Sequence, residues 1–156
     1  MQNLLITPDE VIELAFSTHD QIDSDVITDS RIEAAQLKFI APALHKLYPP
    51  LIAGVYDDFL REYIKPALAY FIKYNIFLCL SVRIGNDGII RVRPTDSTPV
   101  DSSEIGRLRR ECRETAELFL KKALDYLKKN AGKFPEFQPD NGKEKKRIKM
   151  NGGLII

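Results

Sequence analysis

The spacing of apolar residues predicts a mainly helical protein. Apolar side chains recur at intervals of three and four, the period of an amphipathic helix, in four stretches: residues 8–16, 28–47, 56–80 and 102–130. The first stretch also carries a start signal, because Thr7 is followed by a proline at the first helical position and by Glu10 three residues on. We therefore expect four helices joined by polar loops.

Prolines interrupt two of these stretches. Pro42 lies inside the second and Pro66 inside the third. Proline lacks a backbone donor and its ring clashes with the carbonyl group four residues earlier, so each should kink the helix or restart it, and a restart raises the count to five. The pair Pro49 and Pro50 is expected to end the second helix.

The pattern changes after Ser81. Residues 82–93 alternate apolar side chains with Arg83, Arg91 and Arg93, on either side of the turn sequence GNDG. That alternation around a turn predicts a β-hairpin. The predicted fold class is therefore mainly α: a four-helix bundle, or five helices with the kinks, with a β-hairpin inserted before the last long helix and an extended C-terminal tail.

The chain divides into two predicted regions. Residues 1–131 are expected to form one compact helical domain. Residues 132–156 are expected to form a flexible arm, because their apolar spacing is irregular and glycine and proline are frequent. The arm is basic, since five of its seven residues from 143 to 149 are cationic: Lys143, Lys145, Lys146, Arg147 and Lys149.

Charge is distributed unevenly along the 156 residues, although the net charge is only +1. Residues 1–30 contain seven carboxylates and no lysine or arginine, a formal −7, which leaves +8 for the remainder. A total near zero offers no general attraction to nucleic acid or to anionic lipid. The uneven layout instead favours surfaces of opposite sign that join like subunits.

No motif for catalysis or metal binding is evident. His19 and His45 stand far apart and outside any metal-binding spacing. Asp20, Asp23 and Asp25 superficially suggest a calcium loop, but the required glycine and closing glutamate are missing. The chain contains no GxSxG, and GNDG is explained as a turn. We therefore expect no enzyme, no cofactor and no metal.

The apolar region of residues 64–82 is predicted to be a buried helix rather than a membrane span. Lys73 interrupts it, and its longest run without a charge is nine residues, from 74 to 82. A helix needs about 20 apolar residues to cross a bilayer. Cys79 and Cys112 belong to no CxxC or Cys/His cluster, so they are interpreted as reduced core residues of an intracellular protein.

The order of these features resembles the head-tail connector family of tailed bacteriophages, also called head-completion or adaptor proteins. The matching segments are residues 5–10, which enter a capped short helix, residues 20–25, an acidic loop containing DSD, and residues 27–35, rich in Ile, Glu and Ala. An apolar third helix, a small hairpin and a charged fourth helix follow. The resemblance covers roughly residues 4–131.

The resemblance implies a structural component of the virion, present in the bacterial host cytoplasm during assembly. Such proteins form a homo-oligomeric ring between portal and tail and extend the DNA channel. The implied partners are the chain itself and portal or tail-completion proteins, with non-specific DNA proximity and no membrane. The candidate interface residues are Asp20, Asp23, Asp25, Arg83, Arg91, Arg93, Lys143, Lys145, Lys146, Arg147 and Lys149.

An alternative function follows from the basic arm. A small helical nucleic-acid-binding or regulatory module would use residues 143–149 to contact phosphates, with binding that weakens steeply with salt. No aromatic side chain is interleaved there to stack on a base.

Overall fold

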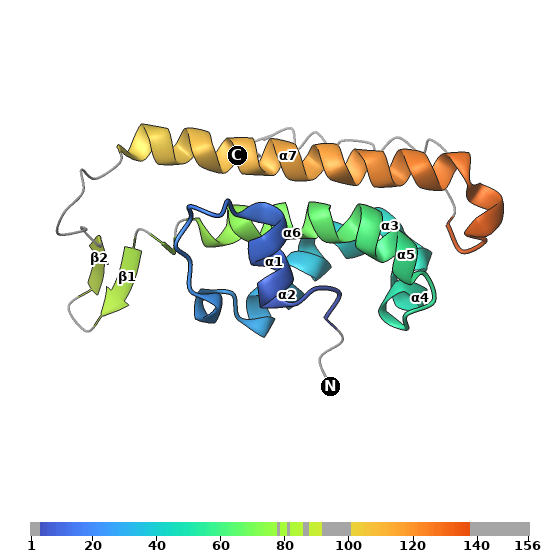
Figure 1. Cartoon of the computed structure of the whole chain (residues 1–156), viewed down its shortest axis with the longest axis horizontal. Helices are drawn as coiled ribbons and strands as arrows, with labels where there is room; N and C mark the ends of the chain where they lie inside the picture. The colour runs from blue at the N-terminus through green and yellow to red at the C-terminus, as the bar shows by residue number, and fades with distance from the viewer. Residues whose placement is uncertain (1–3, 78, 81, 86–87, 92–100, 138–156) are drawn as a thin grey trace, which may run out of the picture.

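The computed structural model describes residues 4–77, 79–80, 82–85, 88–91 and 101–137. A long helix extends along one side of the molecule, and shorter helices form a layer beside it (Figure 1). In chain order the helices are α1 (Pro8–Ala15), η1 (Ser24–Val26), α2 (Asp29–Ala35), η2 (Gln36–Ile40), α3 (Ala41–Leu44), η3 (His45–Leu47), α4 (Tyr48–Ile52), α5 (Asp57–Phe59), η4 (Leu60–Ile64), α6 (Lys65–Ile76), α7 (Ser102–Lys129) and η5 (Ala131–Lys133). Segments η2 and η4 are π-helical, and η1, η3 and η5 are 3-10 turns.

Helix α6 is the centre of the core. It packs against α7 on one side and against α1 and α2 elsewhere. Its buried side chains face several directions, which agrees with the largely apolar sequence of this stretch: Ala67, Leu68, Ala69, Phe71, Ile72 and Ile76. The long helix α7 buries a single stripe, made of Cys112, Ala116, Ala123 and Leu127. That stripe keeps the three- and four-residue spacing on which the prediction of this helix rested.

The prolines inside the second and third helical stretches are accommodated by π-helical turns. Segment η2 immediately precedes α3, which contains Pro42, and η4 immediately precedes α6, which contains Pro66. In each case the carbonyl group four residues before the proline belongs to the wider π turn. This geometry relieves the ring clash and leaves proline in the first turn of a new helix, where no donor is needed. A new α-helical segment thus begins beside each proline, and the helical backbone continues into it from the π turn.

The expectation that Pro49 and Pro50 end a helix is wrong. Both lie within α4, close to its start. Proline is tolerated in the first turn of a helix because the backbone donors there have no intrahelical partner. The chain therefore continues as a short helix to Ile52.

The predicted fold class is wrong in its β component, whereas its helical part agrees with the structure. The body is mainly helical, and its core is built from the helices, their connecting loops and the short segments that flank α1 and η5. The four-residue segments β1 (Val82–Gly85) and β2 (Gly88–Arg91) pair with each other and lie to one side of the helical layers (Figure 1). Two short strands without a covering element supply no core of their own, so no hairpin is a component of the bundle.

The packed body includes residues beyond 131. Phe134 and Phe137 are buried, with exposed fractions of 5% and 8%. The Phe134 ring centroid lies 5.2 Å from that of Phe59, and the Tyr56 hydroxyl donates to Glu136 at 2.6 Å. These contacts attach residues 134–137 to the helices. The basic run of the predicted arm lies outside the described residues.

Candidate functional site

Four exposed carboxylates form what we call the acidic face: Asp9, Asp23, Asp25 and Asp29. Asp9 is in the first turn of α1 and Asp29 begins α2. Asp23 caps η1 by accepting a hydrogen bond from the Asp25 backbone N–H at 3.1 Å. A carboxylate is stabilised at a helix N-terminus by unpaired N–H groups and by the helix dipole, so three helix starts gather negative charge on one surface.

The acidic face is hollowed by two shallow depressions. Asp9, Asp25 and Asp29 line one of them, and Asp9 and Asp23 line the other. Neither depression is lined by a lysine or arginine among the residues that the structure describes. The nearest cation on α2 is the half-buried Arg31, which donates to the Val26 carbonyl at 2.9 Å. The acidic face therefore presents a surface of one sign to solvent.

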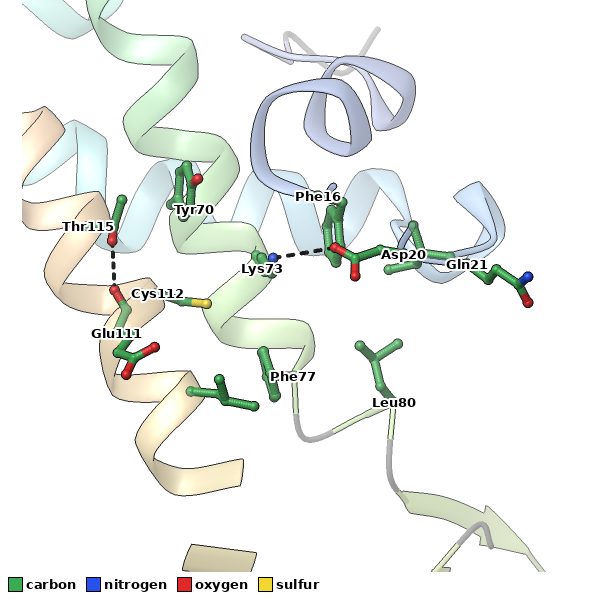
Figure 2. A pocket seen from close by; sticks show the side chains of 12 residues that line it. Phe16, Asp20, Gln21, Tyr70, Lys73, Phe77, Leu80, Glu111, Cys112 and Thr115 are labelled. Carbon is green, nitrogen blue, oxygen red and sulfur yellow. Dashed lines mark hydrogen bonds and ion pairs between the residues drawn. The ribbon is translucent and has the colours of Figure 1, made fainter. Parts of the chain in front are cut away.

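Asp20 has a different place. Its carboxylate accepts a hydrogen bond from the Ser17 backbone N–H at 2.8 Å and lies 4.0 Å from the Lys73 ammonium. Figure 2 shows it turned toward a groove between the end of α1, α6 and α7, a groove of about 610 Å³. The structure thus separates Asp20 from Asp23 and Asp25, with which it was grouped as a candidate interface residue.

Lys73 is at the middle of the groove in Figure 2. Its ammonium donates to the Ala15 carbonyl at 2.7 Å, at the end of α1, and lies 4.4 Å from the centroid of the Phe16 ring. The side chain is only 18% exposed. A charge this far from solvent needs such partners. Lys73 therefore ties α6 to α1 and to the loop that follows it.

Cys112 lies across the groove on α7, with an exposed fraction of 8%. Burial raises the pKa of its thiol, although the charge of Lys73 opposes that shift. The thiol is thus protonated at neutral pH, whereas a nucleophilic cysteine needs the thiolate. The Lys73 ammonium is already hydrogen-bonded to the Ala15 carbonyl. Cys112 and Lys73 therefore contribute to packing and do not form a nucleophile with an activating cation.

The basic candidate residues are placed only in part. Arg83 lies in β1 opposite Ile90, and Arg91 lies in β2 opposite Val82. Arg93 and the basic run of residues 143–149 lie outside the described residues. The role of these arginines in an interface remains a prediction.

Asp9 and Asp29 are the members of the acidic face that sequence reasoning did not select. The signal was present, because each follows a threonine at a helix start, Thr7 or Thr28. What the sequence lacked was the packing that brings the starts of α1 and α2 together. Within the described residues, no group of three or more His, Cys, Asp or Glu is placed to hold a metal ion. The same residues include no helix with the length and apolar character needed to cross a bilayer.

Comparison with known proteins identifies one family. The chain matches the family described as "Family of unknown function (DUF6712)" over residues 19–147, which is more than half of its length. The chain belongs to this family. No curated protein and no solved structure gives a significant match.

Proposed function

We propose that this member of the DUF6712 family of unknown function is a structural subunit of a phage particle, similar to head-tail connectors. In this role the protein assembles as a homo-oligomeric ring between portal and tail and extends the DNA channel. The order of sequence features described above supports this role.

The acidic face is the observation that carries the proposal. Its four carboxylates are exposed and belong to the stretch of residues 1–30 that contains no cation. Cations collect elsewhere, and the exposed lysines of the second half of α7 are Lys121, Lys122, Lys128 and Lys129. A subunit with opposite charges on different surfaces can join a second copy by a contact between unlike faces. Contacts of that kind generate rings when the rotation closes.

Co-purification with a portal ring tests this function. The full chain, tagged and co-expressed with a phage portal protein, is expected to be retained with the portal. The double variant D23K/D25K should weaken retention or ring formation, because it reverses two of the four charges of the acidic face. The matched control is D57K/D58K, which reverses two exposed carboxylates at the start of α5. Absence of retention with portal and with tail-completion proteins contradicts the proposal.

The nucleic-acid-binding or regulatory module stays as the alternative. It predicts DNA binding that falls steeply as salt rises and is lost when residues 143–149 are removed. Salt-sensitive DNA binding of this kind, without retention on the portal, would favour the alternative.

A further inference from the structure

A second groove lies between the second half of α7 and η4. Its walls combine aromatic and cationic side chains, and its volume is about 570 Å³. We call it the α7 groove. Its lining residues include Tyr63, Leu118, Phe119, Lys121, Lys122 and Tyr126. Two of its lysines, Lys121 and Lys122, belong to the cationic second half of α7 described above.

The α7 groove is cationic. Three lysines and one carboxylate, Asp125, are among its lining residues, the third lysine being Lys129. Elsewhere on α7, Arg107 and Arg113 pair with glutamates one turn away, as in the 2.8 Å pair of Arg113 and Glu117. The salt bridges between described residues include neither Lys121 nor Lys122. The groove thus has cationic charge available for an acidic partner.

The groove is also apolar. Leu118 is 66% exposed, the highest value among the exposed large apolar side chains of the described residues. Below it, Tyr63 and Tyr126 stack with ring centroids 4.4 Å apart, and Phe119 adds a third ring to the wall. Burying apolar surface of this kind stabilises a contact by about 25 cal/mol per Å². An occupant that combines carboxylates with apolar side chains would therefore match the groove.

The acidic face has this composition. The depression lined by Asp9 and Asp23 is also lined by Ile12 and Ile22, which are half-buried. We propose that the α7 groove binds the acidic face of a second copy of this chain, with Lys121 and Lys122 opposite the aspartates of the neighbour. This inference rests on the proposed ring function and names the two surfaces that meet in it.

The placement of the two surfaces makes the contact intermolecular. The acidic face lies on η1 and on the starts of α1 and α2, whereas the groove lies on the second half of α7 and on η4. Helix α6 lies between α2 and α7 (Figure 1). The two surfaces of one chain therefore cannot meet each other. A contact between these unlike surfaces leaves one acidic face and one α7 groove free on every dimer. Further copies can therefore add until the assembly closes as a ring or extends as a filament.

A nucleic-acid strand fits the groove less well. Binding to single strands relies on aromatic faces open to the bases. The faces of Tyr63 and Tyr126 lie against each other, and the Lys122 ammonium lies 5.4 Å from the Tyr63 centroid. The stacking surface is thus already occupied. The exposed Leu118 offers an apolar contact suited to a protein partner.

Charge exchange between two variants tests the proposal on the full chain. K121E/K122E makes the groove acidic, and D23K/D25K places two lysines on the acidic face, where Asp9 and Asp29 remain as carboxylates. Each variant alone should associate at least about tenfold more weakly than the wild type, because like charges then oppose each other. An equimolar mixture should recover association, because the reversed groove of one variant matches the reversed face of the other. K128E, an exposed lysine of α7 outside the groove lining, is the matched control.

Association is measured by sedimentation equilibrium up to about 1 mM chain, where a contact with a Kd of about 1 mM is roughly half formed. Far-ultraviolet circular dichroism checks that each variant is folded. Recovery in the mixture supports the inference. A wild type that stays monomeric, a mixture that does not recover, or a loss caused equally by K128E overturns it. Binding of a single-stranded oligonucleotide that K121E/K122E abolishes, without self-association, also overturns it.

These outcomes separate the inference from the proposed function. Retention on the portal with no sensitivity to K121E/K122E refutes the pairing of surfaces and leaves the connector role standing. Charge-exchange recovery without retention on the portal or tail proteins supports the pairing and refutes the connector role.

Discussion

Gln36 is the buried polar side chain of the described core, and its replacement by leucine gives a strict test of the packing. The amide is 1% exposed. Its oxygen accepts a hydrogen bond from the Leu5 backbone N–H at 2.7 Å, and its nitrogen donates to the Tyr48 hydroxyl at 3.3 Å. The side chain therefore holds the segment before α1 against the π turn η2 and against α4.

The magnitude follows from the group left without a partner. In Gln36→Leu, the Leu5 N–H stays buried and has lost its acceptor, and an unsatisfied buried donor costs about 1–3 kcal/mol. The apolar gain of leucine offsets part of this cost, so we expect the free energy of unfolding to fall by about 1–2 kcal/mol. In a domain of this size, each kcal/mol lowers Tm by roughly 2–4 °C.

Urea unfolding followed by circular dichroism measures the change. The midpoint should fall while the slope m stays constant, because the surface exposed on unfolding is the same. Hydrogen exchange of the Leu5 amide should accelerate in the variant. Gln21→Leu makes the same chemical change at an exposed position and should shift stability by less than about 0.5 kcal/mol. A Gln36→Leu protein as stable as the wild type would refute the reasoning.

Three further predictions concern other contacts. The hydrogen bonds of Glu10 with Lys65 and with the Thr7 backbone outweigh burial and lower the pKa of its carboxyl below the ordinary 4.5. The wild type should therefore have a higher urea midpoint than Glu10→Gln above about pH 4.5. This difference in midpoint should disappear as the pH falls through the lowered pKa. Lys73→Met removes a charge-assisted hydrogen bond and should cost about 1–3 kcal/mol in urea unfolding. Phe134→Ala empties a buried aromatic site and should cost about 3–5 kcal/mol by the same measurement.

Each of these has a control and a contrary result. Glu13→Gln, at an exposed position of the same helix, is the control and should not show a comparable change in urea midpoint relative to the wild type. If the midpoint of Glu10→Gln stays below that of the wild type by the same amount down to about pH 3, the lowered pKa of Glu10 is contradicted. Lys38→Met removes an exposed lysine of η2 and controls for the loss of charge. Equal losses of stability in Lys38→Met and Lys73→Met would argue against a stabilising contact between Lys73 and the end of α1. Leu118→Ala should change stability by less than about 0.5 kcal/mol, and a Phe134→Ala effect that small would place residue 134 outside the core.

The local signals of the sequence determined where several helices begin and which stripe they bury. Both hydrogen bonds of the capping box between Thr7 and Glu10 form at the start of α1, at 3.0 and 3.3 Å. The spacing of apolar residues likewise predicted the helix over residues 102–130, and α7 buries Cys112, Ala116 and Leu127 at that spacing. These features depend on contacts within three or four residues, which is the range that a sequence pattern reports.

Tertiary structure decided how the prolines are used and what the alternating segment contributes. Whether Pro49 ends a helix or lies in the first turn of the next depends on the direction the chain takes after Leu47, a fully buried residue. The alternation near residues 82–91 carried no information on whether any element would cover the paired segments. A strand becomes part of a core only when a third element packs on it.

The candidate surfaces divide in the same way. The sequence alone determined that residues 1–30 carry seven carboxylates and no cation. Only tertiary packing placed Asp20 beside Lys73 of α6, whereas Asp23 and Asp25 belong to the acidic face. The α7 groove arises from Tyr63 and Lys122, 59 positions apart, with the lysine ammonium 5.4 Å from the ring centroid. Spacing along a chain cannot report such a contact, because it depends on how two helices pack.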